Sequence, residues 1–177
     1  MKKYEFTGET KEIRLLFRTA TLHRIRATVA FGIVEVGDLG GWIEKEENLS
    51  HEGKAWVCGD AEVWGNAEVC GDAEVWGNAE VCGDAKVCGD AEVFSASHVL
   101  VIGAIGSRND FTTFYRDKDN EITVKCGCFL GKIDRFLEKV TQTHGDSKYA
   151  LVYRAAVEVA KLQIDLSGEA PKDADEE

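Results

Sequence analysis

The chain has 177 residues, of which 44% are hydrophobic, and its formal net charge is −11. This length suits one domain of ordinary size or two small ones. No apolar run reaches the roughly 18 residues that cross a bilayer, and the start MKKYE has no signal-peptide core, so we expect a cytoplasmic protein. Residues 55–96 hold nine acidic side chains and one lysine, which argues against direct binding of nucleic acid there.

Residues 1–36 are expected to form a β-rich cap. Three stretches, at residues 13–17, 22–29 and 33–36, have the composition of short strands. A stacked repeat exposes a sheet edge at its end, and a cap would cover that edge. In the following segment Ile43 and Leu49 lie six residues apart, so we expect a first, degenerate repeat unit there.

A six-residue pattern, Ala-x-Val-x-Gly-(Asp/Asn), repeats from Ala55 to Val93. Within each unit Ala and Val alternate with Glu and with Cys or Trp, which predicts a short strand with one buried face. The Gly-Asp and Gly-Asn pairs tolerate the backbone of a sharp corner. Units this small bury their apolar faces only by stacking. Three units per turn would give an 18-residue coil. The alternative is a 12-residue coil, which would align Cys58, Cys70 and Cys82.

The lead-in GDLGGWIEKEENLS, followed by GKAWV and the repeat, resembles hexapeptide-repeat proteins, in particular uncharacterised phage and prophage members with an appended C-terminal α+β module. The resemblance implies a mainly β fold with a short left-handed parallel β-helix, a solenoid, over residues 37–96. IGSRNDFTTFY, VKCGCFLG and THGD carry the likeness to the appended module. Enzymes of this family transfer acyl groups with a histidine as base, so His51 would be the catalytic residue of an acyltransferase.

Residues 97–166 change character and are expected to form a small α+β domain. Apolar stretches at 99–102, 111–115 and 122–128 predict three strands. Helical spacing follows at 133–140 and again at 149–164, which gives the order βββαα. The acidic tail, residues 167–177, is expected to be disordered.

Several polar groups of this domain could converge on a ligand. A pocket for an anionic or polar molecule would use Arg108, Asn109, Thr112, Thr113 and His144. The competing interpretation is that residues 107–110 form only a turn and that His144 ends a helix.

The cysteines support no metal or cofactor site by their spacing. Cys126, Cys128 and His144 would bind zinc only with His98 or Asp146 as a fourth ligand, and a Cys–His nucleophilic pair is the other chemical interpretation. Small buried thiols are the simpler one. All six cysteines are expected to be free in a reducing compartment.

We therefore predict an acidic, non-enzymatic interaction protein of phage type, an inhibitor of a host nucleic-acid-binding or defence protein such as a nuclease with a basic surface. Alternatives are the acyltransferase, a small-ligand sponge or a structural phage protein. A homo-oligomer is expected, without cofactor, membrane or nucleic acid. The predicted interaction surface comprises Trp64, Trp76, Glu62, Glu68, Glu74 and Glu80. The competing interpretation is that neighbouring turns cover the two indoles and that the carboxylates are simply solvated.

Overall fold

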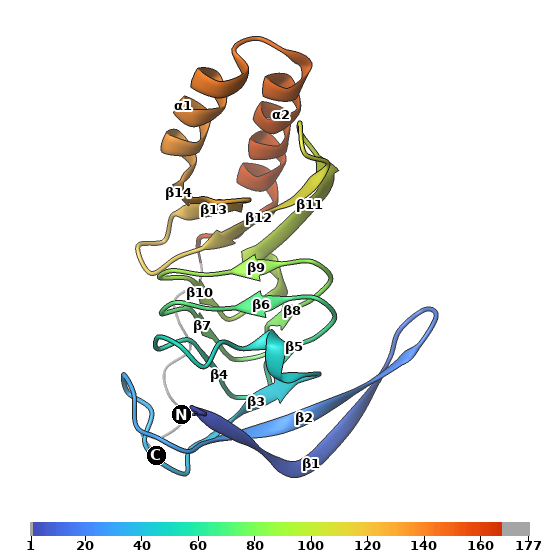
Figure 1. Cartoon of the computed structure of the whole chain (residues 1–177), viewed down its shortest axis with the longest axis vertical. Coiled ribbons are helices and arrows are strands. Elements are labelled where there is room, and N and C mark those ends of the chain that lie inside the picture. The colour runs from blue at the N-terminus through green and yellow to red at the C-terminus, as the bar shows by residue number, and fades with distance from the viewer. Residues whose placement is uncertain (1, 168–177) are drawn as a thin grey trace.

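The computed structural model describes residues 2–167 and arranges them in three tiers (Figure 1). A long β-hairpin lies at one end, the repeat occupies the middle, and a sheet covered by two helices lies at the other end. No helix among the described residues is long and apolar enough to cross a membrane.

The strands at the two ends are long and those of the repeat are two residues each. The N-terminal strands are β1 (Tyr4–Arg14), β2 (Thr19–Ala27) and β3 (Leu39–Ile43). The repeat contributes β4 (Trp56–Val57), β5 (Glu62–Val63), β6 (Glu68–Val69), β7 (Glu74–Val75), β8 (Glu80–Val81), β9 (Lys86–Val87) and β10 (Glu92–Val93). The C-terminal unit contains β11 (Val99–Ile105), β12 (Asp110–Arg116), β13 (Ile122–Cys126), β14 (Phe129–Lys132), α1 (Ile133–His144) and α2 (Lys148–Gln163).

Residues 55–93, which we name the repeat stack, pair in parallel across a spacing of eighteen residues. Val63 pairs with Val81, Val69 with Val87, and Val75 with both Val57 and Val93. These pairings form three separate ladders, β3-β5-β8, β4-β7-β10 and β6-β9. They confirm the 18-residue period and exclude the 12-residue alternative.

The side chains inside the repeat stack are the valines and alanines of the pattern. Each of them, from Ala55 to Val93, is at most 1% exposed. The glycine corners lie directly above one another: a Cβ on Gly71, whose φ is 73°, would come 2.7 Å from the backbone nitrogen of Gly89. The predicted inward and outward alternation is confirmed, because only small apolar residues fit between the three ladders.

The predicted fold class is wrong. The resemblance implied a mainly β, left-handed parallel β-helix, whereas the described residues form a mixed α and β structure with four small separate sheets and two helices. One sheet combines antiparallel and parallel strands, and another is antiparallel throughout. The reason is that each six-residue unit leaves only two residues in a ladder, while the flanking segments build longer antiparallel strands of their own.

The N-terminal cap also differs from the expected three short strands. β1 and β2 form one long antiparallel hairpin that projects to one side (Figure 1), and β2 also pairs antiparallel with β3. Residues 33–36 form no strand; Phe31 and Val34 make only an isolated bridge. Leu16 and Phe17, at the tip of the hairpin, are 87% and 94% exposed.

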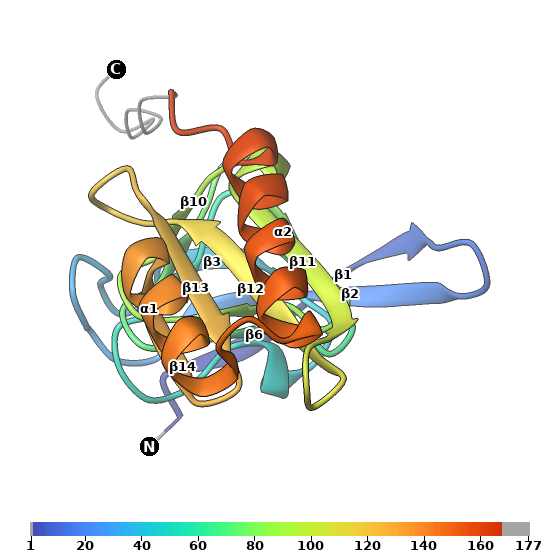
Figure 2. The same ribbon diagram turned by 90° about the horizontal axis from the view of Figure 1, so that it is seen from above.

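The C-terminal unit places β11 and β12 between two cores. Val99, Val101 and Tyr115 pack against the repeat stack. Alternate residues of the same strands, including Leu100 and Phe114, pack against α1 and α2. Both helices lie over this sheet in Figure 2. Both predicted helices are confirmed, but the sheet has four strands, because the short segment Phe129–Lys132 also pairs. Of the predicted disordered tail, all but Ser167 lies outside the described residues.

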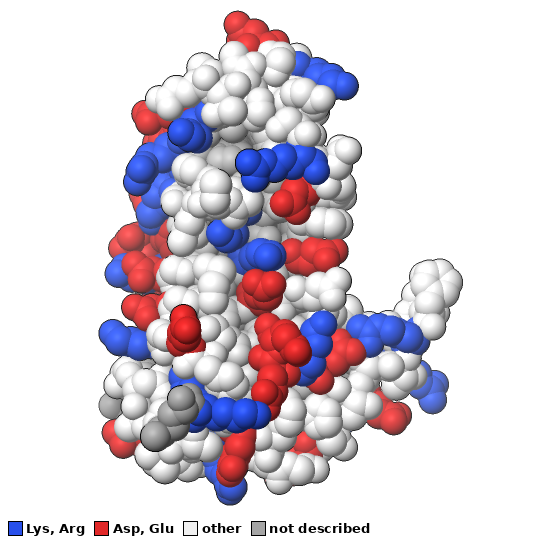
Figure 3. All heavy atoms as spheres, in the orientation of Figure 1, with Lys and Arg blue, Asp and Glu red and all other residues white. Residues whose placement is uncertain are grey.

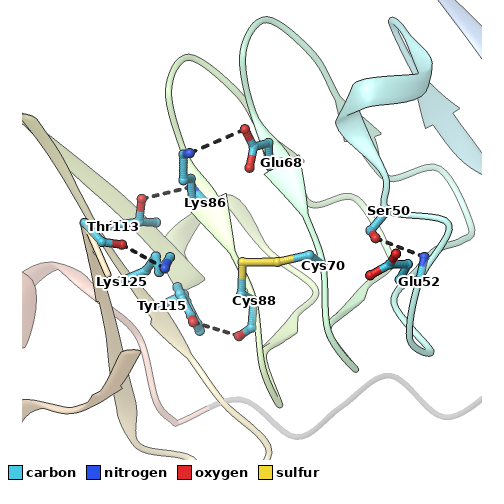
Figure 4. The surroundings of a disulfide bond; sticks show 10 residues. Ser50, Glu52, Glu68, Cys70, Lys86, Cys88, Thr113, Tyr115 and Lys125 are labelled. Atoms are coloured by element: carbon cyan, nitrogen blue, oxygen red, sulfur yellow. Dashed lines mark hydrogen bonds and ion pairs between the residues drawn. A yellow bond between two sulfur atoms is a disulfide. The ribbon is translucent and has the colours of Figure 1, made fainter. Parts of the chain in front are cut away.

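A disulfide joins Cys70 to Cys88 on the outside of the repeat stack (Figure 4). Their Cα atoms are 4.6 Å apart, which is within the range of disulfides. The expectation of free thiols throughout is therefore wrong. An 18-residue period places Cys70 and Cys88 on adjacent turns, whereas a 12-residue period would align Cys70 with Cys58 and Cys82 instead.

Candidate functional site

A cavity of about 300 Å³ lies between the C-terminal sheet and the two helices. The turn between β11 and β12 contributes one side, the β13–β14 turn another, and α1 and α2 the rest. Of the five residues predicted to form a pocket, Arg108 and His144 line the cavity, together with Cys126 and Cys128.

The inner wall of the cavity is aromatic. The rings of Phe129 and Phe136 lie 5.3 Å apart, and Tyr153 meets Phe136 edge-on at 5.5 Å. His144 stacks on Tyr153 with ring centroids 5.8 Å apart. A flat apolar ring would gain both burial and edge-to-face contacts against this wall.

The rim of the cavity carries positive charge. Arg108 and Lys139 are exposed, and within residues 2–167 neither side chain has a hydrogen bond or ion pair. Asp110 is the carboxylate of the rim, and its Oδ1 accepts the backbone N–H of Phe111 at 2.8 Å. A guanidinium and an ammonium at the mouth of an apolar cavity attract an anion with an apolar body.

The turn that carries Arg108 depends on a glycine. Gly106 has a φ of 73°, and a Cβ there would come 1.9 Å from the Tyr153 hydroxyl oxygen. Asn109 also has a positive φ, at 48°, and its N–H is 3.4 Å from the Gly106 carbonyl oxygen. The predicted turn is thus confirmed for residues 107–109, whereas Asp110 begins β12, and this turn brings Arg108 to the cavity.

The thiol on the sheet side is hydrogen-bonded. Thr112 Oγ1 donates to Cys126 Sγ at 3.3 Å, and that sulfur lies 3.9 Å from the Tyr153 hydroxyl oxygen. Burial, with Cys126 nearby, raises the pKa of Tyr153 to about 12, so the phenol is protonated at neutral pH. Tyr153 is therefore a hydrogen-bond donor to a ligand rather than a base.

The remaining residues of the predicted pocket do not line the cavity. Asn109 lies in the turn, and Thr112 is buried against Cys126. Thr113 is buried facing the repeat stack, where its hydroxyl oxygen accepts the N–H of Lys86 at 3.0 Å (Figure 4). Successive strand residues point to opposite faces, so Thr112 and Thr113 could not both have faced one site.

The proposed zinc ligands do not assemble. No group of three or more His, Cys, Asp or Glu side chains within residues 2–167 could hold a metal ion. His98 is buried away from the cavity, where its Nδ1 accepts the Phe94 N–H at 3.3 Å; burial, and then Arg116, lower its pKa.

His51 does not offer a base. Its Nδ1 accepts the Lys3 N–H at 3.1 Å and its ring stacks on Tyr4 at 4.3 Å. Its Nε2 is buried without a hydrogen-bond partner among the described residues, and burial lowers the pKa of the ring. A general base needs a nitrogen within reach of substrate, so this histidine gives the acyltransferase no support.

The predicted interaction surface is partly occupied by the chain itself. Trp76 is half-buried and meets Phe94 edge-on at 5.5 Å, and Trp64 is half-buried. Among the carboxylates, Glu62 pairs with Lys11 at 2.7 Å and Glu68 with Lys86 at 3.4 Å. The other two glutamates differ, since Glu80 is exposed and Glu74 is half-buried in a groove.

That groove, of about 340 Å³, lies between the repeat stack and the loop of residues 31–34. Its carboxylates are Asp72, Glu74, Asp90 and Glu92, with Lys54 and Lys118 at its margins. On another face of the molecule Figure 3 shows acidic side chains in a column over the repeat stack, with basic ones above and beside it.

Sequence reasoning missed the apolar half of the cavity. Phe136 and Tyr153 follow ordinary helical core spacing, and nothing in that spacing separates a cavity wall from a filled core. Lys139 lies on the face of α1 that lines the cavity, together with Phe136, Val140 and His144. A lysine on the same helix face as apolar residues is the sequence feature that could have pointed to the cavity.

No protein-family model matches the chain, and no curated protein matches it. The resemblance to hexapeptide-repeat proteins is therefore not supported. The predicted phage origin and anti-defence role find no support in the structure or in these comparisons, and we do not propose them.

Proposed function

We propose that the protein binds a small organic anion with a flat apolar ring in the cavity of the C-terminal unit. The observation that carries the proposal is the pairing of two unpartnered cations, Arg108 and Lys139, with the aromatic wall behind them. The net charge of −11 repels anions from the chain as a whole, and the two cations at the cavity mouth offset that repulsion locally.

The geometry assigns a role to each side of the ligand. Its ring lies against Phe129, Phe136 and Tyr153, and its carboxylate or phosphate meets Arg108, whose planar fork of donors suits either group. A volume of about 300 Å³ is at the lower end of ligand cavities, so the ligand is small.

Calorimetry with three probes tests the proposal: benzoate, phenyl phosphate and benzylamine. We expect the two anions to bind and benzylamine, which has the same ring and the opposite charge, not to bind. Arg108→Gln weakens anion binding about 10- to 100-fold, as expected for loss of a hydrogen bond to a charged group. Arg135→Gln, on the exposed face of α1 outside the cavity, is the matched control.

Three results would each contradict this function. They are equal binding of benzylamine and benzoate, an equal loss in Arg108→Gln and Arg135→Gln, or no binding of either anion.

A second candidate function is supported by the groove on the repeat stack. Its wall includes Ile33, which is 80% exposed, beside the carboxylates of Asp72, Asp90 and Glu92. An exposed apolar side chain next to aligned carboxylates suits a partner segment that carries basic and apolar residues. We propose an interaction with a protein of basic surface at this groove.

A peptide of alternating Lys and Leu tests this second function against one of alternating Glu and Leu. We expect only the basic peptide to bind, and its affinity to fall with salt. Glu92→Gln weakens binding, whereas Glu80→Gln, an exposed carboxylate outside the groove, does not. Equal effects of the two substitutions would contradict a specific groove.

A cytoplasmic location is a further proposal. The redox state of Cys70 and Cys88 tests it. Cytoplasmic proteins rarely keep disulfides. Alkylation in intact cells, followed by peptide mass spectrometry, is expected to find Cys70 and Cys88 as thiols if the protein resides there. A persistent Cys70–Cys88 disulfide would contradict the cytoplasmic location.

A further inference from the structure

We propose that a second copy of this chain packs against the outer face of α2, helix against helix and antiparallel. One stripe of this face is apolar and exposed. Leu151 is 59% exposed, Val159 48% and Leu162 89%, and Ala155 is exposed between them. Their spacing of four, four and three residues places them on one side of the helix.

The opposite side of α2 is already buried. Tyr153, Val157 and Ala160 pack against α1 and the sheet and are at most 7% exposed. Beyond its buried side, α2 therefore carries one exposed apolar stripe, with the ion pair of Glu158 and Lys161 beside it. Contiguous exposed apolar patches on a protein surface mark interaction sites more often than scattered single residues do.

The two ends of the face select a second copy as the occupant, because each end carries an exposed leucine and the charges beside these leucines are of opposite sign. In an antiparallel pair with Leu151 of one copy against Leu162 of the other, the small Ala155 opposes Glu158, whose charge is paired with Lys161 of its own helix at 3.0 Å. Lys148, the first residue of α2, lies three residues before Leu151, and Asp165, two residues past the end of α2, lies three residues after Leu162. Antiparallel packing therefore places opposite charges together at both ends, and parallel packing would place like charges together.

The other apolar or terminal segments fit this face less well. Residues 168–177, GEAPKDADEE, contain no large apolar side chain. The β1–β2 tip, with Leu16 and Phe17, carries an arginine on each side, Arg14 and Arg18, whereas the face of α2 has a lysine at one end and an aspartate at the other. Because Tyr153 lies on the buried side of α2, the contact leaves the anion cavity open and is independent of the proposed function.

Sedimentation velocity over a concentration series tests the contact in the full-length chain. We expect a dimer, weakened about tenfold or more by Leu162→Glu, which brings two carboxylates into an apolar contact. Leu16→Glu is the matched control, since it places the same charge at an equally exposed leucine of the hairpin tip. Both positions are exposed in the monomer, so both variants are expected to melt as the wild type does.

A charge swap tests the orientation. Lys148→Asp is expected to weaken the dimer, and adding Asp165→Lys to restore it. A wild type that stays monomeric, a dimer dissociated by Leu16→Glu instead of Leu162→Glu, or a double variant that fails to recover would overturn the proposal. Removal of residues 168–177 is expected to leave the dimer unchanged; dimerisation that appears only after this removal would also overturn it.

Discussion

In the repeat stack, residues eighteen apart have the same role, whereas in the C-terminal unit each lining residue has its own. Val57, Val75 and Val93 fill one column of the stack interior in the same way. Arg108, Lys139 and Tyr153 come from three different elements and give the cavity two charges and a phenol. A ligand site needs such an asymmetric set, so repetition supplies length and support while the irregular unit supplies chemistry.

The largest expected effect tests whether neighbouring turns of the repeat stack are joined as the structure has them. In the purified, oxidised protein, Cys70→Ser with Cys88→Ser removes a link that closes a loop of about 18 residues, and we expect the free energy of unfolding to fall by about 3 kcal/mol. Denaturant unfolding measures it. Cys126→Ser, in the C-terminal unit, is the control; an equal loss there would contradict the assignment.

A smaller effect tests the contact between glycine corners. Gly71 and Gly83 have φ values of 73° and 65°, so alanine strains both backbones alike. Only at Gly71 does the added Cβ meet the next turn, 2.7 Å from Gly89 N, while Gly83 has nothing within 4 Å. We expect Gly71→Ala to cost about 2 kcal/mol more than Gly83→Ala. Equal melting curves would contradict the 18-residue stacking.

The sequence predicted the repeat stack far better than the rest. The Ala-x-Val pattern is local and recurs seven times, so it gave the buried face and limited the coil to 18 or 12 residues, of which the pairing of the strands shows 18. It could not give the fold class, because the flanking antiparallel sheets are set by long-range pairing. It also could not choose Cys88 as the partner of Cys70 while a 12-residue duplication remained an open alternative.

The cavity was half predictable for a similar reason. Arg108 and His144 stand out as polar residues in turn and helix-end contexts. The aromatic residues look like any buried helix positions until the two helices are placed over the sheet. Thr113 was predicted to line the pocket because it is polar and adjacent to Thr112, but adjacent residues of a strand point to opposite faces, and Thr113 faces the repeat stack.

The third prediction concerns the hydrogen bond that joins the C-terminal sheet to the repeat stack and its contribution to the free energy of unfolding. The Tyr115 hydroxyl donates to the Cys88 carbonyl oxygen at 2.7 Å, across from the C-terminal sheet to the repeat stack (Figure 4). Tyr115→Phe leaves that buried acceptor unpaired and is expected to cost about 1.5 kcal/mol. Tyr149→Phe, on α2, is the control. A single cooperative transition that does not shift in Tyr115→Phe would contradict this coupling.

The smallest expected effect concerns pH at the N-terminal end. Burial lowers the pKa of Lys3 to about 8, and its ammonium donates to the Ala55 carbonyl oxygen at 2.6 Å. Between pH 8 and the ordinary lysine pKa the unfolded chain holds a proton that the folded chain has released, so stability rises with pH in that window. Relative to Lys3→Met, we expect the wild type to gain about 1 kcal/mol from pH 7.5 to 9.5. A flat difference would contradict this burial.

Thiol protection compares the two regions within one molecule and tests the anion site most directly. Cys128 lines the cavity and is exposed, whereas Cys82 lies half-buried on the repeat stack. With saturating benzoate or phenyl phosphate, we predict that alkylation of Cys128 slows severalfold and that of Cys82 keeps its rate, as followed by peptide mass spectrometry. An unchanged rate at Cys128, or the same slowing at both cysteines, would contradict a ligand site in the C-terminal unit.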